Sequence, residues 1–232
     1  MKKLVGFLLL VCWQVYLYAG TYEVLSPDGK LKVTLTVSDG LGMEVFYDGQ
    51  SLFGASNIGI CLQQQAFKPV VRSVKRSSAN ETIIPVVPLK FASVANHYNA
   101  LRLNLKGNLA IEFRAYDDGM AYRFVTNGNG NKTLVYNETA DFNLPEEAVL
   151  HLQQPVGFKT PYEEPYSHVA LKEWKDSSKF ALLPLLVDTK KGVKLLFSES
   201  DLYNYPCMFL KANEGKGVSA LFPRYPLETK PI

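Results

Sequence analysis

Alternation of apolar and polar residues is the strongest pattern in this chain. Between residues 31 and 37, leucine and valine alternate with lysine and threonine, and Leu101, Leu103 and Leu105 repeat the pattern. A period of two residues is typical of a strand with one buried face. No segment sustains the 3.6-residue period of an amphipathic helix. Further strands are predicted at residues 43–47, 50–53, 58–62, 70–74, 108–116, 120–125, 134–136, 139–142, 149–152, 180–188, 192–197 and 217–222.

Turn sequences separate these segments. Ser26-Pro-Asp-Gly precedes the first alternating strand, and Asp48-Gly49 predicts a tight hairpin. Pro85 and Pro88 interrupt residues 77–95, which are therefore expected to be irregular or to lie at a sheet edge. Residues 155–175 are the longest irregular stretch. Many short strands joined by Gly, Asp and Pro turns predict an all-β fold, an antiparallel sandwich.

The first 20 residues have the form of a secretory signal peptide. Two lysines precede an apolar run over residues 4–18, and the small residues Ala19 and Gly20 follow. The run is too short to span a bilayer comfortably. We therefore expect a secreted, periplasmic protein that does not span the membrane. Cys12 could mark a lipoprotein instead, but bulky apolar residues precede it, so this alternative is disfavoured.

Composition is that of a globular domain with no strong charge. The 232 residues are 47% hydrophobic and 20% charged, and removal of Lys2 and Lys3 lowers the formal net charge from +3 to +1. A charge so close to zero gives no electrostatic reason to expect nucleic-acid binding. Cys61 and Cys207 remain after removal of the signal peptide. They could form a disulfide or be two buried free thiols, and the sequence is compatible with both alternatives.

Most of the other polar residues have ordinary structural explanations. His97, His151 and His168 are scattered without metal-ligand spacing, and His97 is expected to satisfy hydrogen bonds at a strand entry. Asp117 and Asp118 form an adjacent carboxylate pair, but an Asp-Asp-Gly turn accounts for both. Glu163 and Glu164 lie beside tyrosines in the 155–175 stretch, which suits sugar contact, although a plain surface loop is the preferred interpretation.

The segment 195–210 presents the main candidate for chemistry. Apolar strand-like sequence flanks a short polar knot, residues 198–207, that carries Glu199, Asp201, two tyrosines and Pro206. Proline cannot donate to a β-ladder, so the knot is expected to be a loop or a broken strand. Carboxylates two residues apart could share a cation, but for Asp201 a turn-capping role is preferred.

This knot carries a resemblance to a known family. Glu199-Ser-Asp-Leu-x-x-Tyr-Pro-x-Met resembles the end of the N-terminal domain of glycoside hydrolase family 97, the secreted α-glucosidases and α-galactosidases typified by starch utilisation in Bacteroidetes. Three other segments agree in order: Ser26-Pro-Asp-Gly-Lys30, Asn96-His-Tyr-Asn99 and Glu112-Phe-Arg-Ala-Tyr-Asp-Asp-Gly-Met-Ala-Tyr-Arg-Phe124.

The resemblance implies a fold and a role. It implies a large antiparallel two-sheet β-super-sandwich, similar to galactose mutarotase, over residues 21–222. Residues 223–232 would then lead towards a catalytic (β/α)8 barrel that this sequence lacks. It also implies that Glu199 joins glutamates of the barrel around a calcium ion, which prefers carboxylate oxygens. The catalytic groups for α-linked oligosaccharides would lie in the barrel, so this chain is expected to have no catalytic residues and no turnover alone.

Two alternatives to this role stay open. The chain could be a free-standing carbohydrate-binding module that uses a sandwich face or the 155–175 stretch. It could also be a purely structural secreted sandwich. Saturable sugar binding without the barrel would distinguish the first from a domain that only assists an enzyme.

Overall fold

The computed structural model describes residues 20–126, 133–203 and 205–224, and these form three antiparallel sheets. The largest sheet has eight strands in the order β1-β2-β3-β4-β9-β16-β15-β12. Its strands are β1 (Gly20–Leu25), β2 (Leu31–Val37), β3 (Leu41–Tyr47), β4 (Gln50–Leu62), β9 (Val135–Asn143), β16 (Gly217–Leu221), β15 (Phe209–Asn213) and β12 (Phe180–Ala181).

The two other sheets have four strands each. One has the order β5-β6-β7-β8, from β5 (Val71–Ile83), β6 (Val94–Leu105), β7 (Leu109–Tyr116) and β8 (Gly119–Thr126). The other has the order β11-β10-β13-β14, from β11 (Ser167–Ala170), β10 (Val149–Leu152), β13 (Leu185–Asp188) and β14 (Lys194–Phe197). A single 3-10 turn, η1 (Leu171–Glu173), is the only helical element in the part of the chain described.

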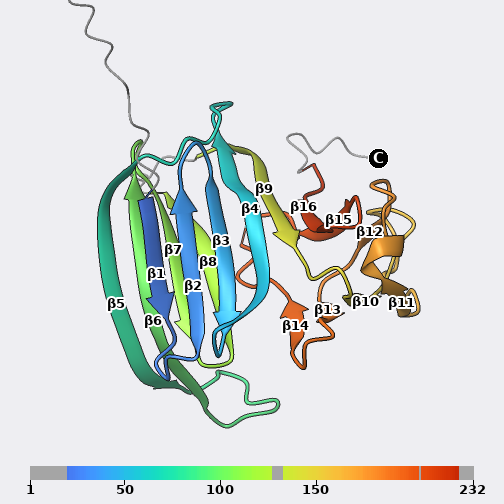
Figure 1. Cartoon of the computed structure of the whole chain (residues 1–232), viewed down its shortest axis with the longest axis horizontal. Coiled ribbons are helices and arrows are strands. Elements are labelled where there is room, and N and C mark those ends of the chain that lie inside the picture. Colours follow the sequence, from blue (N-terminus) through green and yellow to red (C-terminus); the bar gives the residue numbers. More distant parts are fainter. Residues whose placement is uncertain (1–19, 127–132, 204, 225–232) are drawn as a thin grey trace, which may run out of the picture.

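Both small sheets pack on the large one around a single hydrophobic core (Figure 1). β6 and β7 contact β1 and β2. The Phe197 ring on β14 lies 5.4 Å from that of Phe53 on β4 and 5.1 Å from that of Phe142 on β9. The expected all-β antiparallel sandwich is confirmed, and its second layer consists of two separate sheets.

The predicted alternation explains which side of each strand is buried. In β2, Leu31, Val33, Leu35 and Val37 are all buried while the residues between them are not. β7 repeats this pattern around Phe113, which is fully buried. Shifting either strand by one residue would turn its polar side chains into the core, so the pattern determines the register.

Several predicted strands are longer in the structure. Residues 50–53 and 58–62 belong to one strand, β4, whose pairing with β9 shifts between Ser56 and Gly59. Residues 134–136 and 139–142 were likewise predicted as two strands, yet β9 is continuous over Val135–Asn143. A bulge interrupts the alternation without ending the strand, because the chain resumes its ladder afterwards.

Two segments differ from the sequence-based expectation. β5 continues as a regular strand to Ile83, so only the later part of residues 77–95 is irregular, although its edge position is as predicted. The irregular part exposes apolar side chains, including the fully exposed Val86. Residues 180–188 form two strands in different sheets, β12 and β13, separated by the cis peptide bond before Pro184.

The chain ends lie largely outside the described residues. The expected signal peptide and the expected linker fall mostly on residues 1–19 and 225–232, which are not described. β1 begins at Gly20 and β16 ends at Leu221. Across residues 20–126, 133–203 and 205–224, no helix has the length and apolar character needed to cross a membrane.

Candidate functional site

The polar knot joins β14 to β15 and holds Glu199 in a defined position. The backbone N–H of Met208 donates to both carboxylate oxygens of Glu199, at 2.9 and 3.0 Å. Burial raises the pKa of Glu199, and the Met208 N–H opposes this shift. Glu199 is therefore half-buried and oriented before any ligand arrives.

A second contact ties the knot to the large sheet. The Tyr205 hydroxyl donates to Oε2 of Glu138 on β9, at 2.5 Å. The Tyr205 ring also packs edge-on against Phe222, with ring centroids 5.9 Å apart. These contacts fix the end of the knot that leads back to β15.

Glu138 lies on the inner face of β9. It shares the alternation of Ala140 and Phe142, which are both buried. Burial raises the pKa of Glu138, the Tyr205 hydroxyl partly offsets this, and the negative charge of Glu199 adds to the rise. Burial and Glu138 together also raise the pKa of Tyr122. The knot therefore places two carboxylates close enough for one to affect the ionisation of the other.

Exposed apolar side chains occur on the knot itself and at the start of β9, the strand that Tyr205 contacts through Glu138. Leu202 and Tyr203 on the knot are 43% and 82% exposed, and Val135 and Tyr136 at the start of β9 are 39% and 52% exposed. Apolar side chains gathered at the surface often mark an interaction site.

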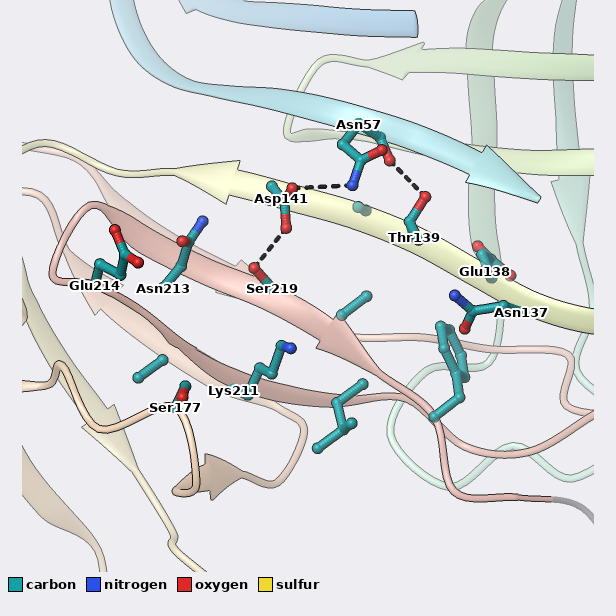
Figure 2. A pocket seen from close by; sticks show the side chains of 15 residues that line it. Asn57, Asn137, Glu138, Thr139, Asp141, Ser177, Lys211, Asn213, Glu214 and Ser219 are labelled. Carbon is teal, nitrogen blue, oxygen red and sulfur yellow. Dashed lines mark hydrogen bonds between the residues drawn. The ribbon is translucent and has the colours of Figure 1, made fainter. Parts of the chain in front are cut away.

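A polar groove lies on the opposite, outer face of β9 (Figure 2). Its volume is about 440 Å³, and it crosses β9, β16 and β15. Thr139, Asp141, Lys211 and Ser219 lie on the outer face, because Lys211 pairs with Ser219 and Ser219 pairs with Asp141 across the strands. The groove is lined by Asn57, Asn137, Glu138, Thr139, Ala140, Asp141, Ser177, Lys211, Ala212, Asn213, Glu214, Ser219, Ala220, Leu221 and Phe222.

A protein-family model matches nearly the whole chain. The model described as glycosyl-hydrolase 97 N-terminal matches residues 24–226. The chain belongs to this family. The family resemblance of the sequence motifs is thereby confirmed, and the chain is the N-terminal domain of a family 97 glycoside hydrolase.

Known relatives extend well beyond this domain. The chain is 32% identical over 243 residues to a retaining alpha-galactosidase of Bacteroides thetaiotaomicron, covering 99% of this chain and 36% of that protein. It therefore spans about a third of the length of this relative.

Solved structures show the same fold. A glycoside hydrolase family 97 enzyme from Pseudoalteromonas sp. strain K8, in complex with acarbose, matches with a TM-score of 0.74 and 18% identity, over 87% of this chain and 32% of that one. A beta-arabinopyranosidase matches with a TM-score of 0.74 and 20% identity, over 88% of this chain and 35% of that one. At these identities the likeness concerns the fold.

The other sequence candidates of this family 97 domain do not gather around Glu199. Asp117 instead accepts a hydrogen bond from the backbone N–H of Asp28, at 2.9 Å, and so links two turns. Glu163 is exposed on the surface, as expected. In the turn of Asp201 it is the backbone carbonyl that accepts the Tyr203 N–H, so the expected side-chain cap is not seen.

The cysteines and histidines give different outcomes. Cys61 and Cys207 are both free, so the disulfide alternative is wrong for this structure. His97 is exposed on β6, and none of the hydrogen bonds found in the described residues involves its ring, which leaves its expected role unsupported. His151 and His168 looked scattered in the sequence, yet they pair across β10 and β11 with their Nδ1 atoms 2.6 Å apart.

Sequence reasoning missed Glu138, although a signal was present. Glu138, Ala140 and Phe142 occupy alternate positions, which indicates an acid on a buried face. The signal was lost because residues 134–136 and 139–142 were treated as separate strands. Within the described residues, no group of three or more His, Cys, Asp or Glu side chains could hold a metal ion.

The raised pKa of Glu138 gives a prediction for stability against pH. A carboxyl whose pKa is raised on folding stabilises the fold below the usual glutamate value of 4.5, and this contribution is lost as pH rises through the raised value. Glu138→Gln keeps an oxygen acceptor for Tyr205 but cannot ionise. We expect the variant to be more stable than the wild type at pH 7. Above pH 4.5, the free energy of unfolding of the variant should fall less steeply with pH than that of the wild type.

Urea unfolding at several pH values between about 4.5 and 8 tests this, since the slope of stability against pH reports proton binding. Asp28 and Asp188 do not interfere in this range, because hydrogen bonds from Ser26 and Lys190 respectively lower the pKa of each below 3.8. Asp118→Asn, in an exposed turn, is the matched control and should leave the profile unchanged. Equal profiles for Glu138→Gln and the wild type would contradict a desolvated Glu138.

Proposed function

We propose that this domain assists an exported family 97 α-glycosidase, bracing its catalytic (β/α)8 barrel and donating Glu199 to a calcium ion shared with that barrel. The substrate class proposed for the whole enzyme is α-linked glucosides or galactosides, in line with the alpha-galactosidase relative. The N-terminal apolar run supports export to the periplasm. The single observation that carries the proposal is the preoriented Glu199 carboxylate at the surface knot.

The chemistry of Glu199 fits one ligand position of a calcium ion. The two carboxylate oxygens share the single backbone N–H of Met208, which leaves lone pairs for a cation. Calcium takes about six to eight oxygen ligands. Because the described residues contain no group of three metal-ligating side chains, the remaining ligands would come from the barrel.

The contribution of this chain to catalysis would be one of position and charge. Calcium, when bound, would supply a positive charge that can stabilise developing negative charge on a substrate oxygen. The Met208 N–H orients Glu199 towards that site, and the Tyr205–Glu138 hydrogen bond holds the rest of the knot. The general acid and the base or nucleophile would be residues of the barrel, so no turnover by this chain alone is expected.

The exposed side chains around the knot would form part of the bracing surface. Tyr203 and Tyr136 are the kind of large amphipathic residues that are enriched in protein interfaces. Covering them with the barrel would also remove water from Glu199 and so strengthen its attraction for a cation.

Calcium titration by calorimetry tests this proposal. The mature chain would be titrated alone and after mixing with the catalytic barrel of the Bacteroides thetaiotaomicron relative. We expect no heat from the chain alone and saturable binding from the mixture. Outer-shell residues of metal sites are already worth about 10–100-fold in affinity, so Glu199→Gln, which removes a direct ligand, should weaken binding by at least about 100-fold.

Asp201→Asn is the matched control, since it removes a carboxylate two residues away without touching Met208. It should leave the calcium affinity of the mixture unchanged. Calcium binding by the mixture that is insensitive to Glu199→Gln, or no gain on mixing, would overturn the proposal.

A further inference from the structure

The outer-face groove does not include Glu199, although Glu138 and Phe222, which contact Tyr205 of the knot, are among its lining residues. Asn137, Thr139 and Asp141 alternate with the inward residues Glu138 and Ala140. Figure 2 shows Asn137, Thr139 and Asp141 at the groove together with Glu138, whose carboxylate accepts the Tyr205 hydroxyl. Because Glu199 is not among the lining residues, a ligand in the groove would not need the calcium ion proposed at Glu199.

Asp141 is held in one orientation at the floor of the groove. Nδ2 of Asn57 donates to its Oδ2 at 3.2 Å, and the Ser219 hydroxyl donates to its Oδ1 at 2.5 Å. Asn57 is itself positioned by the β4 bulge, where its φ is +53° and its carbonyl accepts the Thr139 hydroxyl at 2.7 Å. A carboxylate fixed from both sides is a preorganised acceptor for a hydroxyl group.

Three further polar side chains at the groove have no polar partner among the described residues. Within residues 20–126, 133–203 and 205–224, the structure shows no hydrogen bond or ion pair from the side chains of Asn137, Lys211 or Asn213. Two side-chain amides and an ammonium group thus remain available, with both donors and acceptors. Figure 2 shows that they come from β9 and β15, on two sides of Ser219.

The groove adjoins a second cavity. A second cavity of about 280 Å³ shares Asn57, Asn137 and Thr139 with it and extends to Phe67. Leu221 and Phe222, at and just after the end of β16, add apolar surface to the lining of the first cavity. Ligand sites of this size usually combine a few placed polar groups with apolar surface.

The chemistry of the lining selects among ligand classes. Asp141 and Glu214 outnumber the single ammonium of Lys211, which disfavours phosphates and other anions. The abundance of amide, hydroxyl and carboxylate groups disfavours an apolar ligand. A neutral ligand with many hydroxyl groups can pair with donors and acceptors alike.

We propose that this groove binds a neutral oligosaccharide, with Asp141 as its central acceptor and Asn137, Lys211 and Asn213 as flanking contacts. The two cavities share lining residues, and their combined volume favours a chain of several sugars over a single sugar. The proposal does not rest on calcium donation by Glu199, so each can fail without the other.

Isothermal titration of the mature chain with maltotriose and with cellotriose tests the groove without calcium. We expect saturable binding of at least one, with a dissociation constant on the order of 1 mM. Asn137→Ala and Lys211→Ala, both surface changes, should each weaken binding by about 5-fold or more, the effect of losing one hydrogen bond of about 1 kcal/mol or more. Asp141→Ala should weaken it further.

Two controls locate the site. Asn80→Ala removes an exposed amide from β5, in another sheet, and should leave binding unchanged. Glu199→Gln should also leave it unchanged, which separates this result from the calcium experiment. The proposal is wrong if neither trisaccharide binds at about 10 mM, a weak-affinity limit. It is equally wrong if Asn137→Ala and Lys211→Ala have no effect, or if inorganic phosphate binds more tightly than the sugars.

Discussion

Gly217→Ala is expected to destabilise the domain by about 3 kcal/mol or more, the upper end of the cost of overpacking. A Cβ atom at Gly217 would lie 1.8 Å from the carbonyl oxygen of Phe142 and 2.8 Å from its carbonyl carbon. Both are backbone atoms of β9, so no side-chain rotation relieves the clash. The change would push β16 away from β9. The outer-face groove depends on the pairing of these two strands.

The midpoint of urea unfolding measures the effect. Gly119→Ala on β8 is the matched control, because it is also a strand glycine and its added Cβ meets nothing within 4 Å. That variant should unfold close to the wild type. If Gly217→Ala were as stable as Gly119→Ala, the close approach of β16 to Phe142 would be refuted. Because Asp141 on β9 is held by Ser219 on β16, Gly217→Ala should also lower the affinity of the groove for any ligand.

Phe113→Ala is expected to cost about 3–5 kcal/mol, as large-to-small changes of buried aromatic residues usually do. Phe113 is fully buried on β7, and its ring centroid lies 5.8 Å from that of Tyr122. Tyr122 in turn packs edge-on against Phe124, at 6.3 Å. Removal of the Phe113 ring would therefore leave a cavity in the core beside Tyr122.

Phe91→Ala is the control for this change. Phe91 is 66% exposed in the loop between β5 and β6, so the same substitution there should alter stability by no more than about 0.5 kcal/mol. Thermal and urea unfolding of the two variants give the comparison. A small effect of Phe113→Ala would mean that the β7 face is not packed as described. Because burial, and to a smaller extent the charge of Glu138, raise the pKa of Tyr122, loosening of the packing around Tyr122 should lower its pKa towards the ordinary value.

Strands could be predicted from the sequence where one of their faces is buried. β2 and β7 were predicted at nearly their observed bounds, because every second residue is apolar and the turns beside them carry Gly and Asp. Prediction failed where strands are bulged or partly exposed. β4 looked like two strands because the bulge at Asn57 breaks the alternation. The later part of β5 was predicted to be irregular or at an edge because Pro85 and Pro88 follow it, and its exposed residues show no alternation that would indicate a strand.

The candidate site was accessible only in part. Glu199 was found because a family motif surrounds it, and the structure adds the Met208 N–H that orients it. Its neighbour Glu138 lies 61 positions earlier in the chain, and no local pattern connects the two. The groove was missed for a different reason: Thr139, Asp141 and Ser219 are polar positions of the kind expected on any solvent-facing strand.

The all-β class, the buried faces, most turns and membership of the glycoside hydrolase family 97 N-terminal domains could all be predicted from the amino-acid sequence. These depend on local periodicity and on motifs, which act over a few residues. The spatial neighbours of each segment became known from the three-dimensional structure. They include the Tyr205–Glu138 hydrogen bond, the His151–His168 pair and the division of residues 180–188 between two sheets. Strand order depends on contacts between residues far apart in the chain, and the alternation within one strand carries no information about its neighbours.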